Sequence, residues 1–392
     1  MKLRRYMILV AALLTTAMFF ACGGGSSGGD ESPGTTPTAA TGIFKDSNVG
    51  GLQYTTSSGQ SGTTDAFGHY NYMTGDTVTF SVGGVALGSA VASGVVTPVD
   101  LVVGGSSSST QVLNIVRFLM MIDANGDPDD GITISAAVQA AAASWTPLDF
   151  SNLGFDALVT PLITECQTAD GGAHLLPDAV TAQNHLEASM RCAYSGAFRG
   201  TFSGSDNGTF GVIVDPQTGE VRGVAYSNTY DSTTEAYGSG IVDYDQTMAF
   251  ITGFVDTGAT FHGQLTTPDT MSGTWQDTYT SDHGSFSGNR IGGAAESAYR
   301  YTGVAYNDDS SAGAVLAMDI SGNTLTGIGY GVEDNDQFSI SGTLSGSTID
   351  ATASNGVQIS GTLNSDDTFY GTWYNPADGD SGTFDGCGCP LN

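Results

Sequence analysis

The stretch GTWQDTYTSDHGSF, residues 273–286, returns near the carboxyl end as GTWYNPADGDSGTF, residues 371–384. Glycines inside and outside it keep the same offset of 98 positions, in the pairs Gly263 with Gly361, Gly273 with Gly371, Gly284 with Gly382 and Gly288 with Gly386. Chance does not produce four such matches with matching neighbours. Residues 192–297 and 298–392 are therefore predicted to be two copies of one structural unit.

Each copy contains about eight short strand candidates separated by Gly, Asp, Asn and Ser turns, a spacing typical of antiparallel hairpins. Eight hairpin-linked strands can protect their edges by closing into a barrel or by forming two packed sheets. We expect two barrel-like lobes. A transmembrane barrel is the rival architecture, but these strands are rich in glycine and lack a continuous lipid-facing apolar stripe.

The sequence before the repeats divides into two regions that differ in the spacing of their apolar residues. Residues 42–108 alternate apolar and polar residues between glycine turns, which predicts a small β-sandwich. In residues 109–191 the apolar residues recur at helical spacing, with helices expected from Ser109, from Ile134 to Ala143 and from Pro177 to Met190. The predicted fold class is therefore mainly β: a small sandwich, a helical insert, and two duplicated antiparallel meander or barrel-like lobes.

One arginine of the first predicted helix falls on or near its apolar face. Arg117 follows Ile115 and Val116 and precedes Phe118 and Leu119. A buried guanidinium needs a carboxylate partner, because an unpaired charge is costly away from water. We interpret Arg117 as a structural residue and not as a catalytic one.

The amino terminus has a basic start and then an apolar run, Met7 to Phe20, that is too short for a comfortable membrane span. Small Ala21 precedes Cys22. This arrangement resembles the signal peptides of bacterial lipoproteins, which a type II signal peptidase cleaves before an acylated cysteine. The resemblance implies that residues 1–21 are removed and that Cys22 carries the lipid.

Gly23, at the position after the acylated cysteine, implies sorting to the outer membrane by the same resemblance. Residues 22–41 consist of Gly, Ser, Thr, Pro and acidic residues with almost nothing to bury, so they are predicted to form a disordered tether. The expected location is the outer membrane, with the folded body on its periplasmic or cell-surface face.

A second resemblance covers residues 42–135. The segments Thr97-Pro98-Val99-Asp100-Leu101 and Asn114-Ile115-Val116-Arg117-Phe118-Leu119, followed by an Asp-rich turn, resemble an amino-terminal module of proteobacterial surface lipoproteins and adhesin-like proteins. The resemblance implies an exported, surface-associated setting. It implies no activity.

The excess of acidic residues excludes some classes of binding partner. The chain has 40 acidic and 10 basic residues, a formal net charge of −30. Such a surface repels phosphate backbones, because contacts that release counterions require clusters of Lys and Arg. Nucleic acid is therefore excluded as a main partner. The charge can serve solubility, or it can serve the binding of divalent cations.

Apart from Cys22, four cysteines remain in a compartment that permits disulfides. We favour a bridge between Cys166 and Cys192, which would close a loop across the helical region. Cys387 and Cys389 form a Cys-Gly-Cys whose own bridge would be small and strained. No nearby histidine completes a metal site there.

The best candidate for a metal site is the acidic turn after the first predicted helix, with the oxygen ligands Asp123, Asn125, Asp127, Asp129 and Asp130. Oxygen side chains at alternate positions can converge on Ca²⁺. The EF-hand pattern is incomplete, because Pro128 stands where that loop has Gly and Ile134 where it has Glu. The alternative is an acidic turn that ends a helix.

No nucleophile elbow, paired histidines or phosphate-binding loop occurs in a suitable context, so we expect no enzymatic activity. Trp275 and Trp373 occupy equivalent repeat positions, either as core residues of the lobes or as ligand-stacking residues. The sequence favours a non-enzymatic surface or periplasmic interaction or adhesion protein that contacts a protein or a glycan. The alternative is a carrier of small apolar ligands in barrel-like lobes.

Overall fold

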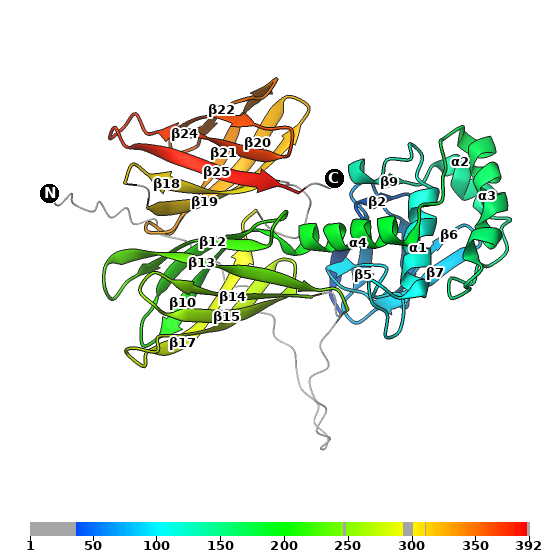
Figure 1. Cartoon of the computed structure of the whole chain (residues 1–392), viewed down its shortest axis with the longest axis horizontal. Coiled ribbons are helices and arrows are strands. Elements are labelled where there is room, and N and C mark those ends of the chain that lie inside the picture. The colour runs from blue at the N-terminus through cyan, green and yellow to red at the C-terminus, as the bar shows by residue number, and fades with distance from the viewer. Residues whose placement is uncertain (1–36, 246–247, 293–300, 310, 390–392) are drawn as a thin grey trace, which may run out of the picture. The chain divides into compact units, whose positions relative to one another are not determined.

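The computed structural model of the chain describes residues 37–245, 248–292, 301–309 and 311–389 (Figure 1). The predicted signal peptide, Cys22 and most of the predicted tether lie outside these residues. None of the helices in the described ranges has the length and apolar character needed to cross a membrane.

The first described region contains two facing sheets and a short parallel pair. One sheet has the order β5-β1-β8, from β1 (Ala39–Phe44), β5 (His69–Met73) and β8 (Val95–Val96). The other has the order β4-β3-β6-β7, from β3 (Gln53–Thr56), β4 (Ser61–Thr63), β6 (Thr77–Val82) and β7 (Val85–Val91). The parallel pair consists of β2 (Val49–Gly50) and β9 (Ile132–Thr133). Aromatic rings join the sheets, since the Phe80 ring lies 4.7 Å from that of Phe44 and 5.2 Å from that of Tyr70.

Four α-helices and one 3-10 turn follow: α1 (Thr110–Met121), η1 (Pro128–Asp130), α2 (Ala136–Ala142), α3 (Phe155–Asp170) and α4 (Ala179–Tyr194). Side-chain caps start two of them, because Ser135 accepts from the amide of Val138 and Asp178 from that of Thr181. The sequence patterns predict α1, α2 and α4 but not α3. That helix contains Pro161 and several β-branched residues, both of which weaken the helical signal.

The sheets and the helices share one hydrophobic core, so the predicted sandwich and the predicted helical insert pack directly against each other. Every residue of α1 from Val112 to Met121 is buried, because the helix is covered on all sides by the rest of the domain. The predicted tether is too long, since β1 already begins at Ala39 and pairs with β5.

Arg117 has the predicted carboxylate partner. Its guanidinium lies 2.7 Å from a carboxylate oxygen of Asp156 and also donates to the carbonyl of Pro177 at 2.7 Å and to Asn114 at 3.1 Å. These contacts hold α1 against the start of α3 and the segment before α4. Arg117 is a structural residue, as the sequence indicates.

The remainder of the described chain forms two closed, eight-stranded antiparallel barrels, as the repeat predicts (Figure 1). The first barrel consists of β10 (Gly196–Gly204), β11 (Gly208–Val214), β12 (Glu220–Ser227), β13 (Ser232–Asp243), β14 (Met248–Val255), β15 (Thr260–Thr267), β16 (Thr270–Gln276) and β17 (His283–Arg290). The second consists of β18 (Tyr301–Asn307), β19 (Ala312–Ser321), β20 (Thr324–Gly331), β21 (Asp336–Ser345), β22 (Thr348–Ala353), β23 (Gln358–Leu363), β24 (Thr368–Tyr374) and β25 (Ser381–Gly388). Closure pairs the first strand of each barrel with its last, which leaves no open edge in either sheet.

The repeated glycines explain why the two copies keep this pattern. Gly263 pairs with Gly273 across two strands, and the ring of Phe286 lies 2.5 Å from where a Cβ would stand at either position. In the second barrel Phe384 lies in the same way over the pair Gly361 and Gly371. Each pair of glycines makes room for one inward-pointing ring, so a side chain at these positions would displace it.

The outer surfaces of the two barrels contact each other through a separate apolar cluster that includes Ile213, Val224, Val315 and Tyr330. The hydroxyl of Thr209 donates to the carbonyl of Val332 at 2.7 Å. An ion pair joins Arg222 of the first barrel to Asp385 of the second at 2.9 Å.

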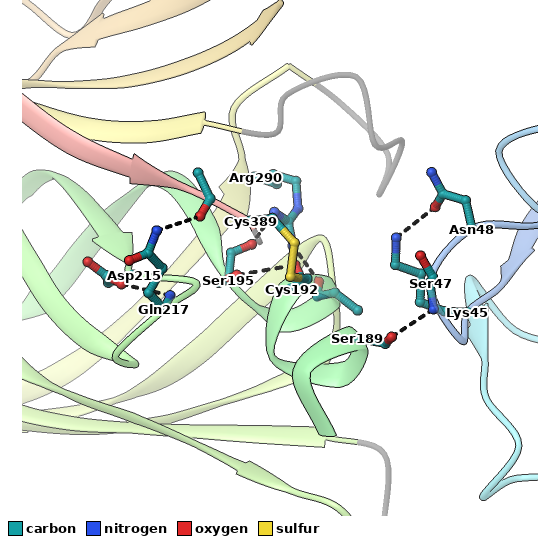
Figure 2. The surroundings of a disulfide bond; sticks show 12 residues. Lys45, Ser47, Asn48, Ser189, Cys192, Ser195, Asp215, Gln217, Arg290 and Cys389 are labelled. Atoms are coloured by element: carbon teal, nitrogen blue, oxygen red, sulfur yellow. Dashed lines mark hydrogen bonds between the residues drawn. A yellow bond between two sulfur atoms is a disulfide. The ribbon is translucent and has the colours of Figure 1, made fainter. Parts of the chain in front are cut away.

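The disulfide pairing differs from the predicted one. Cys192, in the last turn of α4, is bonded to Cys389, just after β25, with 5.5 Å between the two Cα atoms (Figure 2). Cys166 is a free thiol in the core of the first domain, and Cys387 is a free, buried thiol. The predicted Cys166–Cys192 bridge is wrong because Cys166 faces this core while Cys192 lies beyond it. A Cys387–Cys389 bridge is also excluded, since Cys389 is already bonded.

Polar contacts surround the bridge (Figure 2). The guanidinium of Arg290 donates to the carbonyl of Ser195 and, at 2.8 Å, to that of Ala193. Gln217 donates to the carbonyl of Gly388 at 3.2 Å. The end of α4 is thus held both to the first barrel and to the carboxyl end of the second.

A buried carboxyl group predicts a pH dependence of stability. Asp46 is 0% exposed, its oxygens accept no hydrogen bond within the described chain, and His185 Nε2 lies 3.7 Å away. Burial raises the pKa of Asp46 from its usual 3.8 to about 6, against the opposing effect of His185. The folded protein therefore retains this proton at a pH where the unfolded chain has released it.

Stability from this group is therefore complete below about pH 4 and is lost as the pH rises through about 6. We expect the free energy of unfolding of wild type relative to Asp46→Asn to fall by roughly 2–3 kcal/mol across that window. Urea denaturation of both proteins at several pH values measures the difference. A difference that stays constant with pH would contradict the assignment.

Candidate functional site

Four hairpin turns of the first barrel lie at the same end, because strands that alternate in direction bring every second turn together. These turns are residues 205–207, 228–231, 256–259 and 277–282. The turns 205–207 and 277–282 lie next to each other, since β10 pairs with β17 and the amide of Ser205 donates to the carbonyl of His283 at 3.0 Å.

Between these turns the barrel opens into a cavity of about 400 Å³. Its wall is mainly apolar and comes from all eight strands: Phe202, Phe210, Val212, Val221, Ala225, Ala236, Ile251, Val255, Phe261, Met271, Trp275 and Phe286. An apolar cavity of this size lies in the range of small-molecule sites, which is about 300–1,000 Å³. A cavity of roughly 150 Å³ holds benzene, so this one has room for roughly 16 non-hydrogen atoms.

The opposite end of the barrel is covered. Tyr194, at the end of α4, is buried in the same cluster as Phe198 of β10. The guanidinium carbon of Arg290 lies 5.0 Å from the centre of the Phe198 ring. A smaller cavity of about 230 Å³ at this end has a mixed lining that includes Arg191 and Asp215. The main cavity is therefore a cup whose mouth is formed by the four hairpin turns.

Differences between the repeats account for the open space. In the first barrel Ala225 of β12 pairs with Thr234 of β13, and in the second barrel Gly329 pairs with Phe338 at the corresponding places. The Phe338 ring occupies the space where a Cβ at position 329 would stand. One pleat further along, Ala236 of the first barrel corresponds to Ile340 of the second. Small side chains on β12 and β13 thus leave unfilled the volume that Phe338 and Ile340 fill in the other copy.

The two predicted ligand-binding tryptophans are equivalent in position but differ in surroundings. Trp275 lines the cavity, and its indole N–H donates to the carbonyl of Ser203 at 3.2 Å. Trp373 packs against the core of the second barrel and donates to the carbonyl of Tyr306 at 2.9 Å. Both are wall residues held by the neighbouring strand. Of the two, Trp275 borders the cavity.

The mouth is acidic. Asp206, Asp277 and Asp282 are half-buried residues of its lining, which contains no Lys, Arg or His. Asp277 accepts hydrogen bonds from the amides of Tyr279 and Thr280 in its own turn.

Thr234 lies one pleat below the mouth, and its hydroxyl oxygen is buried without a hydrogen-bond partner in the described chain. A buried hydroxyl without a partner is unusual, because it has lost its contacts with water.

The predicted metal ligands form a turn that binds its own backbone. Both oxygens of buried Asp123 accept backbone amides, from Thr133 at 2.8 Å and from Gly126 at 2.9 Å. Asn125 directs its amide nitrogen toward the carboxylate of Asp130. Burial raises the pKa of Asp123.

Within the described ranges of the chain, no group of three or more His, Cys, Asp or Glu has the geometry to hold a metal ion. Calcium binding at this turn stays a prediction.

Comparisons with known proteins give no family assignment. No family model matches the chain, and no curated protein matches it. One similar solved structure is the isotype 1 transferrin binding protein B from serogroup B Neisseria meningitidis, at 9% identity over 46% of this chain and with a TM-score of 0.19. This chain spans 58% of the length of that protein.

Two further structures show the same level of similarity. Intact transferrin binding protein B described as Ap-TbpB, with N and C lobes, matches at 9% identity over 50% of this chain and 76% of its own, with a TM-score of 0.18. A protein of unknown function from the DUF3598 family of Nostoc punctiforme matches at 11% identity over 51% of this chain and 98% of its own, with a TM-score of 0.14. At these TM-scores the similarity supports no inference about binding.

Sequence reasoning found the lobes but not the cavity. The repeat offset aligns the later strands at 98 residues, and there the two copies are most alike. The residues that open the cavity, Ala225, Thr234 and Ala236, lie in earlier strands where loop lengths differ. A strand-by-strand alignment that placed Thr234 opposite Phe338 is the signal that would have indicated it.

Proposed function

We propose that the first barrel binds one small apolar molecule and that the protein acts as a non-enzymatic binding protein. The observation that carries this proposal is the apolar cavity of about 400 Å³, which lies between the four hairpin turns and is covered at its other end by Tyr194 and Arg290. Transfer of apolar surface from water into such a cavity is favourable by about 25 cal/mol per Å². The sequence alone ranks surface interaction first and a carrier of apolar ligands second, and the cavity is the observation that supports the carrier.

A titration with N-phenyl-1-naphthylamine, a neutral fluorophore whose emission rises in apolar surroundings, tests this function. We expect saturable binding with one site per chain, because the proposed site is the cup of the first barrel. Competition by decanol should release the fluorophore at the same stoichiometry. Fluorescence that rises linearly without saturation, or that decanol does not reverse, would count against a defined site.

We further propose that this binding protein is attached to the outer membrane by a lipid on Cys22, on the periplasmic or cell-surface face. The support is the leader pattern, the small Ala21 and the acidic composition of the chain. A single acyl chain binds a membrane only marginally, so stable attachment requires more than one.

Replacement of Cys22 by serine is expected to move the protein from the membrane fraction to the soluble fraction of the host. Labelled palmitate should enter the wild-type chain and not Cys22→Ser. Cell fractionation with immunoblotting measures the first effect and autoradiography the second. A variant that fractionates like wild type would refute the anchor and leave the ligand-binding proposal unaffected.

A second candidate function is contact with a protein or a glycan at the mouth of the cup. Tyr230 is 67% exposed on one mouth turn and Tyr279 is 87% exposed on another. Exposed tyrosines supply large contact area with little loss of side-chain entropy. Tyr279→Ser, at a residue outside the cavity lining, should weaken such a contact while the fluorophore still binds within the barrel.

A further inference from the structure

We infer that the cup in the first barrel selects apolar amines over carboxylic acids, with the ammonium group at the mouth and the hydrocarbon tail inside. This inference rests on the proposed function and specifies the class of its ligand. It combines three observations: the apolar cup, the acidic mouth, and one buried hydroxyl without a partner between them.

The wall below the mouth offers a hydrocarbon tail only apolar contacts. The lower part of the cup is lined by Phe210, Val212, Val221, Ile251 and Met271. A charged or strongly hydrated group placed there would lose its hydration without compensation. The polar end of a ligand must therefore lie toward the four turns.

The mouth favours a positive charge at that end. Asp206, Asp277 and Asp282 contribute carboxylates to a lining without any basic side chain. Asp282 accepts no side-chain hydrogen bond within the described chain, and Asp206 is occupied on one oxygen by the hydroxyl of Ser227 and the amide of Asn207. His283 is the nearest basic residue along β17, but it is exposed. It lies three positions before the inward-pointing Phe286 and therefore on the opposite face of the strand. An anionic head would meet like charges here, and these are only partly screened by water.

Thr234 lies between the apolar lower part of the cup and the acidic mouth, where its hydroxyl can contact the polar end of a ligand. It follows the mouth residue Ser232 by two positions on β13, and such residues lie on the same face of a strand. Its unpartnered oxygen can accept a hydrogen bond from an ammonium group, which has only donors. A ligand amine therefore satisfies a buried hydroxyl that the protein leaves without a partner.

The second barrel lacks Thr234 and Asp277 at the matching places, although Asp380 stands where Asp282 does. Phe338 replaces Thr234, and Asn375 replaces Asp277 while still accepting the amide of Ala377 in its own turn. The same turn thus forms with an amide in place of the carboxylate. Asp277→Asn should therefore keep the local structure and remove only the charge.

Calorimetric titration with decylamine, decanol and decanoate, each below its aggregation concentration, tests the inference because the three ligands share one alkyl tail. We expect decylamine to bind at least about tenfold more tightly than decanoate at low salt, with the difference shrinking in about 0.5 M salt. Decanol should lie between them. Equal affinity of the amine and the acid would overturn the inference and leave the proposed function intact. Failure of all three to bind would overturn the proposed function itself.

Variants test whether the carboxylates at the mouth of the first barrel cause the preference for the amine. Asp277→Asn with Asp282→Asn should remove most of the preference for the amine and leave decanol binding unchanged. The matched control, Asp378→Asn with Asp380→Asn, removes the same charge from the corresponding turn of the second barrel and should keep the preference. A preference that falls equally in both pairs would show attraction by net charge alone and would overturn the inference.

Thr234→Val tests the hydroxyl, because valine has nearly the same shape. We expect decylamine and decanol to bind about three- to tenfold more weakly, with the affinity of the fluorophore nearly unchanged. Unchanged affinity for both decyl ligands would remove Thr234 from the site.

Discussion

The triple variant Ala225→Gly, Thr234→Phe, Ala236→Ile is expected to fold normally and to lose the binding of apolar ligands. These changes give β12 and β13 of the first barrel the residues that stand at the same places in the second, where Phe338 lies over Gly329. A phenylalanine at 234 requires the glycine at 225, because a Cβ there would overlap its ring. The affinity for N-phenyl-1-naphthylamine should fall at least about 100-fold, which corresponds to about 2.8 kcal/mol.

Two comparisons separate a filled cavity from a damaged barrel. The far-ultraviolet circular dichroism and the midpoint of urea denaturation should be at least equal to those of wild type, because filling a cavity adds packing contacts. Thr234→Phe alone, without the glycine, should overpack the wall and lower the midpoint. A triple variant that folds as wild type does and still binds the fluorophore with unchanged affinity would place the site elsewhere.

Loss of the disulfide is the second change with a large expected effect. The bridge joins residues 197 positions apart and so encloses both barrels in one covalent loop. Constraint of a long loop in the unfolded chain stabilises the folded state, typically by about 2–4 kcal/mol and by up to about 5. We expect Cys389→Ser to lower the free energy of unfolding by about 2–5 kcal/mol in urea denaturation.

Chemical reduction of the disulfide is the control for the predicted loss of stability in Cys389→Ser. Treatment of wild type with a phosphine should reproduce the loss, and treatment of Cys389→Ser should change nothing further. Cys166→Ala should keep its response to reductant, because Cys166 is a free core thiol. If Cys166→Ala lost that response, the bridge would join Cys166 and not Cys389.

The features that the sequence predicts well are those that recur at a fixed period. The repeated glycines identify two eight-stranded units, and their register in the barrels pairs Trp275 with Gly284 and Trp373 with Gly382. Such positions can be predicted from the sequence because each glycine makes room for an aromatic ring of the same repeat, so the glycine and the ring recur together. The three predicted helices, α1, α2 and α4, likewise follow from apolar spacing.

The features that the sequence does not predict depend on contacts between distant segments. The pairing of Cys192 with Cys389 requires α4 and the end of β25 to meet, which no local pattern specifies. The single core of the first domain arises because α1 is buried on every face. The difference between a hollow barrel and a filled one depends on Ala225 and Thr234 taken as a pair, since either residue alone is ordinary in a strand.

Anomalous diffraction from a crystal of the protein grown with a bromine-labelled decyl alcohol would show directly whether the first barrel is a ligand site. We expect one bromine position per chain inside the first barrel, among the side chains of Phe210, Ile251 and Met271, with the hydroxyl near Thr234. A bromine position between the barrels or on their outer surfaces, with the cup of the first barrel empty, would contradict it.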